Sequence, residues 1–305
     1  MSWGYIDRLG HKVIEPRFDW TGPFGSGRAP VDIKGRIGFI DEKGAVVIPP
    51  KFGDNTTGFE DGLAVVEMND GKFRFVDPNG ELMPGAYDYA EPFDDGFALV
   101  GNNGRRSYVT KDGEELVGGF DDSNSFRCGV AAVFIDDDWW FIDRCGHFLF
   151  GPFDQADYFS HGLAIVVRKN VRYLLRRSGE MAQFPLQGRW LAVAHHDRIA
   201  FGGEKIGYAD LDGKIVVPPT FEGFSSFRDL RAAVQVESKW GVIDTNGNWI
   251  VRPRFNSASR YSEKLCAVEE NGKYMYLSTD GVKAITTDAD IACDFYEGKA
   301  AIGYD

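Results

Sequence analysis

One glycine recurs along the whole chain at nearly constant intervals, and this spacing restricts the possible folds more than any other feature. Successive glycines are 33 to 36 residues apart, and they are Gly10, Gly44, Gly80, Gly113, Gly146, Gly179, Gly213, Gly247 and Gly281. Six of them follow an aspartate by three residues, namely Asp7, Asp41, Asp77, Asp143, Asp210 and Asp244. This pairing is typical of a turn, because the carboxylate accepts local backbone N–H groups and glycine adopts a positive φ. The period predicts a tandem array of small units.

The residues around this turn follow the same order in each period. A strand-like segment leads into the turn and reads Lys-Trp-Gly-Val-Ile-Asp at 239–244. A short apolar run ending in proline follows, as at 214–219, because proline cannot donate to a strand ladder. A loop with two aromatic residues comes next, then a Gly-x-Ala step that opens another strand, as at 62–66, and a polar hairpin tip such as 69–71. The aromatic pairs are Phe18/Phe24, Phe52/Phe59, Tyr87/Phe93, Phe120/Phe126, Phe153/Phe159, Phe221/Phe227 and Phe255/Tyr261.

Each period therefore predicts about three short strands and one aromatic loop. The strand at 63–66 is apolar at consecutive positions, so both faces of each small sheet are expected to be covered by neighbouring sheets. The predicted fold is all-β, with tandem three-stranded units of about 34 residues in a single array over 1–305. The units are roughly 1–36, 37–72, 73–106, 107–139, 140–171, 172–205, 206–239, 240–273 and 274–305.

The two ends of the array are expected to complement each other. The chain begins at a Trp-Gly strand, and residues 298–305 resemble the strand that precedes such a segment elsewhere. Pairing them would complete one hairpin, as in a propeller, although nine units exceed the usual four to eight blades. A propeller-like ring and an open superhelix both remain possible, with head-to-tail pairing between molecules as a third alternative.

Charge and composition exclude several classes of protein. The formal net charge is −12 and the pI is about 5.0, which disfavours nucleic-acid binding because phosphate backbones are repelled. The sequence shows no secretory signal and no apolar run of the ~20 residues that a membrane helix needs, so we expect a cytoplasmic protein without membrane contact. The four cysteines have no CxxC spacing and are interpreted as small buried residues in a reducing compartment.

The most divergent unit, 172–205, contains the only basic cluster in this acidic chain. Its candidate binding residues are Arg172, Arg176, Arg189, Trp190, His195 and His196. They predict a positive face for an acidic partner or a phosphate, and the alternative is a solvated hairpin. His195 and His196 are not expected to share a metal ion, because adjacent strand residues point to opposite faces.

Tryptophans outside the repeat column are further candidates for contact with a partner. They are Trp20, Trp140, Trp190 and Trp249, whereas Trp3 and Trp240 fill the column and are expected in the core. The acidic pairs at 60–61 and 94–95 recur in register and are interpreted as surface turns, since the two carboxylates of a glycosidase come from separate segments. The acidic tip at 136–138 is likewise interpreted as an exposed turn and not a calcium loop.

The Trp-Gly segments at 3–4 and 240–241, with Gly38 and Gly207 at the same position, resemble the WG (KWG) repeat family, found mainly in bacterial proteins. This resemblance implies β-hairpin repeats that serve as interaction modules, with no catalytic residues. We expect a non-enzymatic protein-binding scaffold without metal or cofactor, for example an immunity or antitoxin-type inhibitor of a basic toxin or effector. The alternatives are a module that binds carbohydrate or cell-wall fragments and, third, an enzyme. The oligomeric state is left open.

Overall fold

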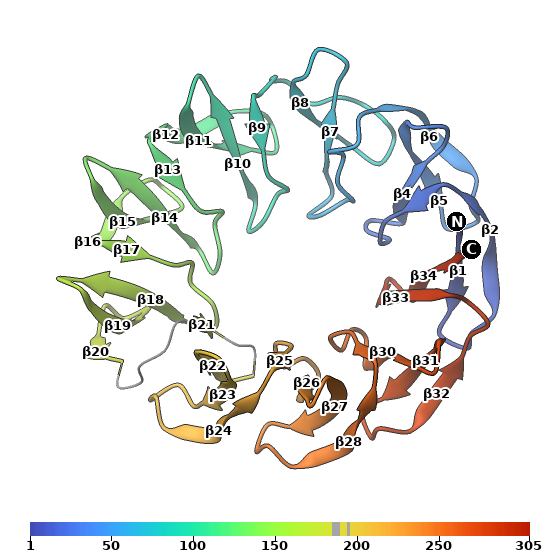
Figure 1. Ribbon diagram of the computed structural model, residues 1–305. Coiled ribbons are helices and arrows are strands. Elements are labelled where there is room, and N and C mark those ends of the chain that lie inside the picture. The colour runs from blue at the N-terminus through green and yellow to red at the C-terminus, as the bar shows by residue number, and fades with distance from the viewer. Residues whose placement is uncertain (185–189, 194–195) are drawn as a thin grey trace. The chain divides into compact units, whose positions relative to one another are not determined.

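The computed structural model describes residues 1–184, 190–193 and 196–305, and for residues 190–193 it describes the backbone. The chain forms two compact units, each larger than the 34-residue repeats: one is made of Met1–Pro23 with Pro185–Asp305 and the other of Phe24–Phe184. Every regular element in the described residues is a β-strand (Figure 1). Over those residues there is accordingly no helix of the length and hydropathy needed to span a bilayer. The predicted all-β class is confirmed.

The unit Phe24–Phe184 consists of small antiparallel sheets that follow one another in chain order. Strands β4, β5 and β6 pair in sequence, β7 pairs with β8, and three four-stranded sheets follow with the orders β9–β10–β11–β12, β13–β14–β15–β16 and β17–β18–β19–β20. The strands are β4 Arg28–Asp32, β5 Ile37–Asp41, β6 Val46–Phe52, β7 Ala64–Glu67, β8 Phe73–Val76, β9 Tyr89–Ala90, β10 Phe97–Asn102, β11 Arg105–Thr110, β12 Glu115–Phe120, β13 Asp122–Ser123, β14 Val130–Ile135, β15 Asp138–Asp143, β16 Phe148–Phe153, β17 Gln155–Ala156, β18 Leu163–Arg168, β19 Val171–Arg176 and β20 Met181–Gln183.

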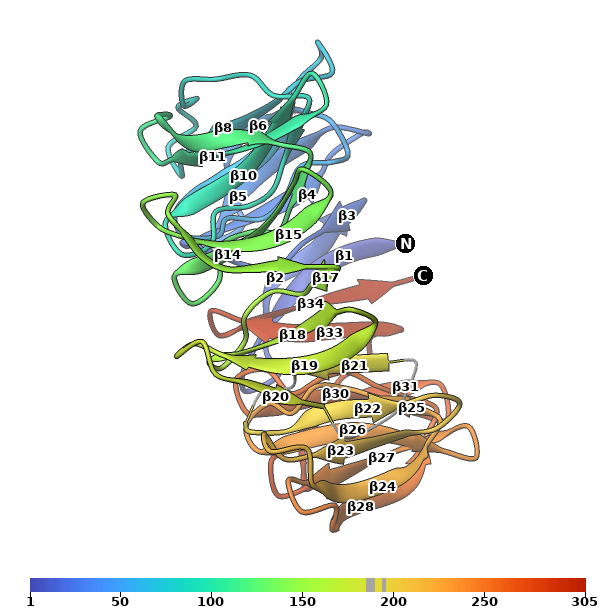
Figure 2. The ribbon, with the colours of Figure 1, turned by 90° about the vertical axis from the view of Figure 1, so that its left-hand side faces the viewer.

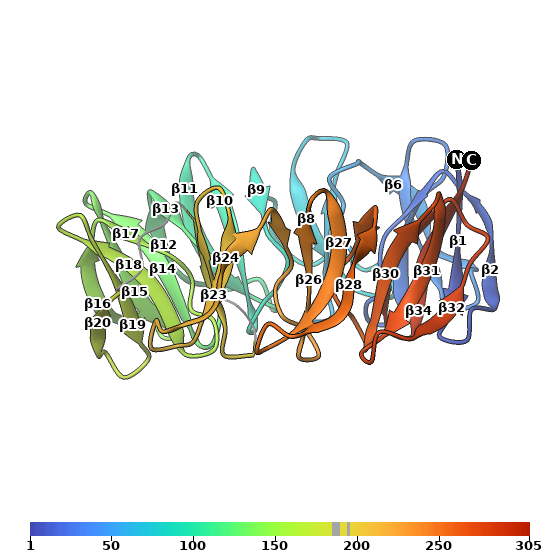
Figure 3. The same cartoon turned by 60° about the horizontal axis from the view of Figure 1, so that its bottom comes forward.

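The other unit contains the first strands of the chain and the last ones. Three sheets follow chain order from β21 to β32, four strands in each, and Figure 3 shows β30, β31 and β32 side by side. The strands are β1 Ser2–Asp7, β2 Lys12–Phe18, β3 Trp20–Thr21, β21 Trp190–Val193, β22 Ile199–Gly202, β23 Ile206–Ala209, β24 Ile215–Phe221, β25 Gly223–Phe224, β26 Arg231–Val236, β27 Lys239–Asp244, β28 Trp249–Phe255, β29 Ser257–Ala258, β30 Leu265–Glu270, β31 Lys273–Ser278, β32 Lys283–Thr286, β33 Ile291–Tyr296 and β34 Lys299–Tyr304.

The first and last long strands of the chain belong to one sheet. Its order is β2–β1–β34–β33, and β1 pairs with β34 without interruption from Ser2↔Tyr304 to Asp7↔Lys299. Figure 2 shows the N- and C-termini beside each other at the ends of these strands. The expected complementarity of the chain ends is thus found, while the choice between a ring and an open superhelix stays a prediction.

Most sheets contain one strand more than the sequence indicated. A two-residue strand lies inside the aromatic loop, as with β13, which pairs with β14 through Asp122↔Phe134 and Ser123↔Val133. Strands β9, β17, β25 and β29 occupy the same place in their sheets. Two residues are too few for an alternating pattern, so this strand has no signal in the sequence.

The predicted Asp-x-x-Gly turns are confirmed in detail. In each of the six, one carboxylate oxygen accepts the backbone N–H groups two and four residues later, at 2.8–3.1 Å. The glycines have φ between 81° and 92° in these turns. The N–H of His147 and that of Cys145 hold the pKa of Asp143 below its usual value. The aspartate column therefore orients the chain for the following strand.

Aromatic residues recur in the core clusters of the 34-residue repeats, which are called modules below. The residue after the Trp-Gly position is buried, and in six modules its ring lies 4.6–4.9 Å from the second aromatic residue of the loop. The hydroxyl of Tyr208, for example, donates to the carbonyl of Ser225 at 3.0 Å. All fourteen loop aromatics predicted as a repeated pair are buried. Edge-to-face packing of this kind adds stabilisation beyond the buried area.

The glycine of the Trp-Gly pair lies against the backbone of its own sheet. A Cβ built on Gly4, Gly38, Gly207 or Gly241 would lie 2.4–2.7 Å from a carbonyl oxygen of the next strand in the same sheet, two residues before a proline. At Gly241 the ring of Trp249 also approaches, at 2.8 Å from such a Cβ. The register of these strand pairs shifts at this point, which is a bulge. The Trp-Gly signature therefore marks where two backbones of one sheet meet.

Candidate binding surface

In the unit Phe24–Phe184, the predicted contact residues do not gather on one face. Trp140 is half-buried against the cluster of Tyr108 and Phe120, with Phe148 edge-to-face at 5.5 Å. Arg172 and Arg176 lie on β19, on the face opposite Tyr173, because strand residues alternate. Tyr173 itself packs against the core cluster that contains Phe141. Arg176 Nε is 3.7 Å from Glu180. Trp140 and the two arginines therefore face different neighbours.

In the other unit, the predicted residues are also separate. Trp20 is 43% exposed, whereas Trp249 is half-buried and its ring packs edge-to-face on Phe221 at 6.1 Å. His196 is exposed and has a φ of 59°, so it lies in a turn and not on the strand that the sequence suggested. Arg189 and His195 lie outside the described residues, as does the side chain of Trp190. The contact role of this set stays a prediction.

The cysteines differ from the expectation that all four are buried. Cys266 is buried and Cys293 is half-buried, but Cys128 and Cys145 are exposed. The two exposed cysteines lie in turns, where no neighbouring sheet covers them. Burial raises the pKa of the Cys266 thiol to about 12, which keeps it protonated and unreactive.

The acidic pairs of the sequence line a depression in the unit Phe24–Phe184. The first acid of each pair lies at a backbone bridge, Glu60↔Leu63 or Asp94↔Phe97. The second acid, Asp61 or Asp95, forms the two-residue turn with the glycine that follows it. The depression has a volume of about 720 Å³ and is lined by Glu60, Asp61, Phe93, Asp94, Asp95, Gly96 and Lys111. Four carboxylates thus face one cation. The sequence showed the pairs but not that turns 34 residues apart adjoin.

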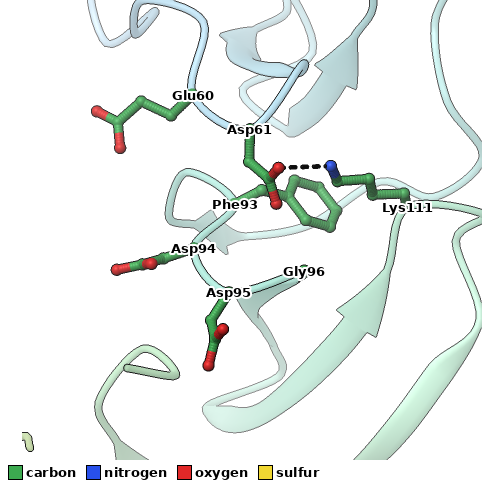
Figure 4. Close-up of a pocket in the computed structure, with 7 residues that line it drawn as sticks. All are labelled: Glu60, Asp61, Phe93, Asp94, Asp95, Gly96 and Lys111. Atoms are coloured by element: carbon green, nitrogen blue, oxygen red, sulfur yellow. Dashed lines mark ion pairs between the residues drawn. The ribbon is translucent and has the colours of Figure 1, made fainter. Parts of the chain in front are cut away.

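The carboxylates in this depression have different partners. Asp61 forms an ion pair of 2.7 Å with Lys111, and Asp95 pairs with Arg144. Figure 4 shows that the side chains of Glu60 and Asp94 extend away from Lys111, toward one side of the depression. Asp94 is 3.4 Å from Arg127 in an exposed pair, which solvent screens.

The charges of Glu60 and Asp94 are not fully balanced. Partial loss of solvent raises the pKa of Glu60, the charge of Asp94 raises it further, and Arg127 acts against both. Loss of solvent also raises the pKa of Asp94, and Arg127 opposes this effect less strongly. Each carboxylate is therefore less stable in its charged form than it is in water. A cation placed between them would stabilise the charged form of both carboxylates and lower their pKa values.

Contacts between consecutive modules fix the turns around such positions. Asp95 accepts the backbone N–H of Gly129 in the next turn, and in the other unit Asp229 accepts that of Lys264 at 2.8 Å. Arginines at the start of the Gly-x-Ala strand donate to the carbonyl that follows the aspartate column beside the next sheet along the chain: Arg28 to Pro78, Arg198 to Thr245 and Arg231 to Thr279, at 2.6–3.1 Å. The sequence analysis missed these contacts, which repeat about 34 or 48 residues apart. The turns are thereby held in place before any partner binds.

Tandem all-β modules with an aromatic core and a bulged Trp-Gly strand define a repeat scaffold. The family model described as WG containing repeat matches residues 3–36, 37–73, 73–105, 206–240 and 240–274, which is more than half of the chain. The chain belongs to this family. Among curated proteins, none matches it in sequence.

Solved structures share the fold at low sequence identity. A structure titled as that of the eukaryotic initiation factor has a TM-score of 0.65 at 10% identity and covers 99% of this chain and 98% of its own. BamB from Moraxella catarrhalis has a TM-score of 0.50 at 11% identity, over 99% of each chain. The computationally designed Ika8 protein has a TM-score of 0.51 at 10% identity, over 86% of this chain and 93% of its own. These similarities support a propeller-like fold and nothing about function.

Proposed function

We propose that the protein is a binding scaffold that recognises a basic segment of a partner protein at the acidic depression around Glu60 and Asp94. The observation that carries this proposal is the depression that four carboxylates line from two adjacent turns, and the raised pKa of Glu60 and of Asp94 is consistent with it. A lysine or arginine side chain of a partner would add a cation beside Glu60 and Asp94, and the bond to a charged donor is stronger than a neutral one. The proposal assigns no catalytic step to the chain.

The finer proposal is that the partner is a basic toxin or effector and that this protein inhibits it in the cytoplasm. Its support is the formal net charge of −12, since complementary charge accelerates association. Pre-organised turns also favour tight binding, because less freedom is lost when the partner docks.

The test is quantitative co-purification from native lysate with three forms of the protein. The variant Glu60→Gln/Asp94→Asn removes both charges. The control Asp136→Asn/Asp137→Asn removes two charges from the exposed tip between β14 and β15, where asparagine tolerates the positive φ of these residues. A partner that is retained by the wild type and the control but reduced at least about tenfold with the first variant supports the proposal. Equal recovery with all three forms, or no protein partner, would overturn it.

A further inference from the structure

The turn at 143–147 combines an aspartate, a cysteine and a histidine, and none of the other Asp-x-x-Gly turns in this sequence does so. Asp143, Cys145 and His147 each present one potential ligand atom, and these atoms all lie within 4.8 Å of one another. Carboxylate oxygen, thiolate sulfur and imidazole nitrogen are the zinc ligands in proteins, at about 2.0–2.3 Å from the ion. A tetrahedral ion with such bonds places its ligand atoms about 3.3–3.8 Å apart, which small side-chain rotations can reach. We propose that these three residues bind a divalent transition-metal ion of the zinc class.

The backbone of the turn orients the three side chains. Asp143 Oδ1 accepts the N–H groups of Cys145 and His147 at 2.8 and 2.9 Å, which fixes the carboxylate. Asp143 Oδ2 faces His147 Nδ1 at 3.2 Å. Cys145 and His147 are exposed, so an ion reaches them without opening the fold.

The first module provides an internal comparison. Its turn has Asp7 and His11 at the matching positions, with His11 Nδ1 3.3 Å from Asp7 Oδ2. The residue between them is Leu9, which is 76% exposed. The aspartate–histidine contact is therefore a feature of the turn itself, and the cysteine distinguishes residues 143–147 as a site with three kinds of ligand.

A depression of about 510 Å³ adjoins Asp143 and Cys145. It is lined by Asp143 and Cys145, together with Asp95, Cys128, Gly129, Arg144 and Arg177. Three protein ligands leave the fourth position of a tetrahedral ion to water. The ion pair of Arg144 with Asp95 reduces the repulsion that an incoming cation would meet.

The test is a titration of the reduced, tag-free, full-length protein with Co²⁺, followed by the thiolate-to-metal absorption band, and then competition with Zn²⁺. The variants Cys145→Ser and His147→Gln are expected to weaken binding by at least about tenfold, because each removes one direct ligand. Cys128→Ser and His11→Gln serve as matched controls and should leave affinity within about twofold. Unchanged binding in Cys145→Ser would overturn the proposal. A loss in Cys128→Ser equal to that in Cys145→Ser would also overturn it, in favour of a dithiol site.

A gain-of-function variant tests the same idea independently. Leu9→Cys supplies the third ligand type to the first turn and should add one equivalent of bound Co²⁺ with a thiolate band. Circular dichroism checks that the β-structure is retained. A folded Leu9→Cys variant that binds no additional Co²⁺ would show that the turn does not position these ligands for a metal.

Discussion

Gly118 and Ser107 pair across β11 and β12, and a Cβ on Gly118 would lie 2.0 Å from Ser107 Oγ. Ser107 occupies the position of the glycine in the Trp-Gly pair. In the next module Trp140 stands there, and a Cβ on the facing Gly151 would lie 2.6 Å from its ring. In these two modules the glycine is thus found on the strand that faces the side chain. Tyr173 and Met275 occupy the same column and pair with Gln183 and Thr286, so the exchange is a property of the Ser107 and Trp140 bulges.

The double variant Ser107→Gly/Gly118→Ala tests this relationship. Gly118→Ala alone should reduce the free energy of unfolding by about 1–3 kcal/mol, because the methyl group overpacks the strand pair. Adding Ser107→Gly should recover about 1 kcal/mol or more as coupling between the sites. Urea denaturation of the four proteins measures the cycle. Additive effects of the two substitutions would contradict the account.

Gly241→Ala tests the bulge in a module that has the glycine of the Trp-Gly pair. The new Cβ would lie 2.7 Å from the carbonyl oxygen of Val251, and neither backbone can retreat without breaking the sheet. We expect a loss of about 1–3 kcal/mol in unfolding free energy. Gly203→Ala is the control, because a Cβ there has no atom within 4 Å, and it should change stability by less than about 0.5 kcal/mol. Equal effects of the two substitutions would be incompatible with a backbone clash.

Tyr208→Phe tests the polar contact inside the aromatic core. The hydroxyl of this fully buried residue donates to Ser225, so its removal leaves a carbonyl without that donor. The expected loss is about 1–2 kcal/mol. Tyr158→Phe, at a side chain that is 37% exposed, should have almost no effect. The midpoint of urea unfolding measures both, and a neutral Tyr208→Phe would show that the hydrogen bond contributes nothing.

The ion pair of Asp70 with Arg74 is expected to contribute to the loss of protein stability at low pH. Arg74 donates two hydrogen bonds to the Asp70 carboxylate and lowers the pKa of Asp70 to about 2, below the value of about 3.9 expected for an unfolded chain. Its stabilisation is therefore present above pH 4 and is lost as the pH falls toward 2. Asp70→Asn should make unfolding free energy fall less steeply between pH 4 and pH 2. Asp136→Asn removes the same charge from an exposed tip and is the control. If the unfolding free energy of Asp70→Asn fell with pH as steeply as that of the wild type, this assignment would be contradicted.

The sequence predicted what depends on contacts within one module. Asp143 and Gly146 reveal their turn because both residues lie in one short segment and act on its backbone. Phe120 and Phe126 reveal the core because their spacing repeats. The period itself, together with the Trp-Gly pair, was enough to predict the fold class and family.

Contacts between segments had no comparable signal. The carbonyl of Val251 that faces Gly241 belongs to the next strand, and a bulge has no periodic pattern. Asp94 lies near Glu60 only because consecutive turns adjoin. The turn at Asp143 was predicted, but the sequence did not show that it places the ligand atoms of Asp143, Cys145 and His147 within 4.8 Å of one another.

Hydrogen–deuterium exchange of residues 2–7 tests most directly whether the repeats join the two ends of the chain in one sheet. The structure pairs these residues with 299–304, so the amides of Gly4 and Ile6 should exchange slowly in the full-length protein. Deletion of residues 299–305 should remove that protection while amides in β14 and β15 stay protected. Fast exchange of residues 2–7 in the full-length protein, or unchanged protection after the deletion, would contradict this sheet.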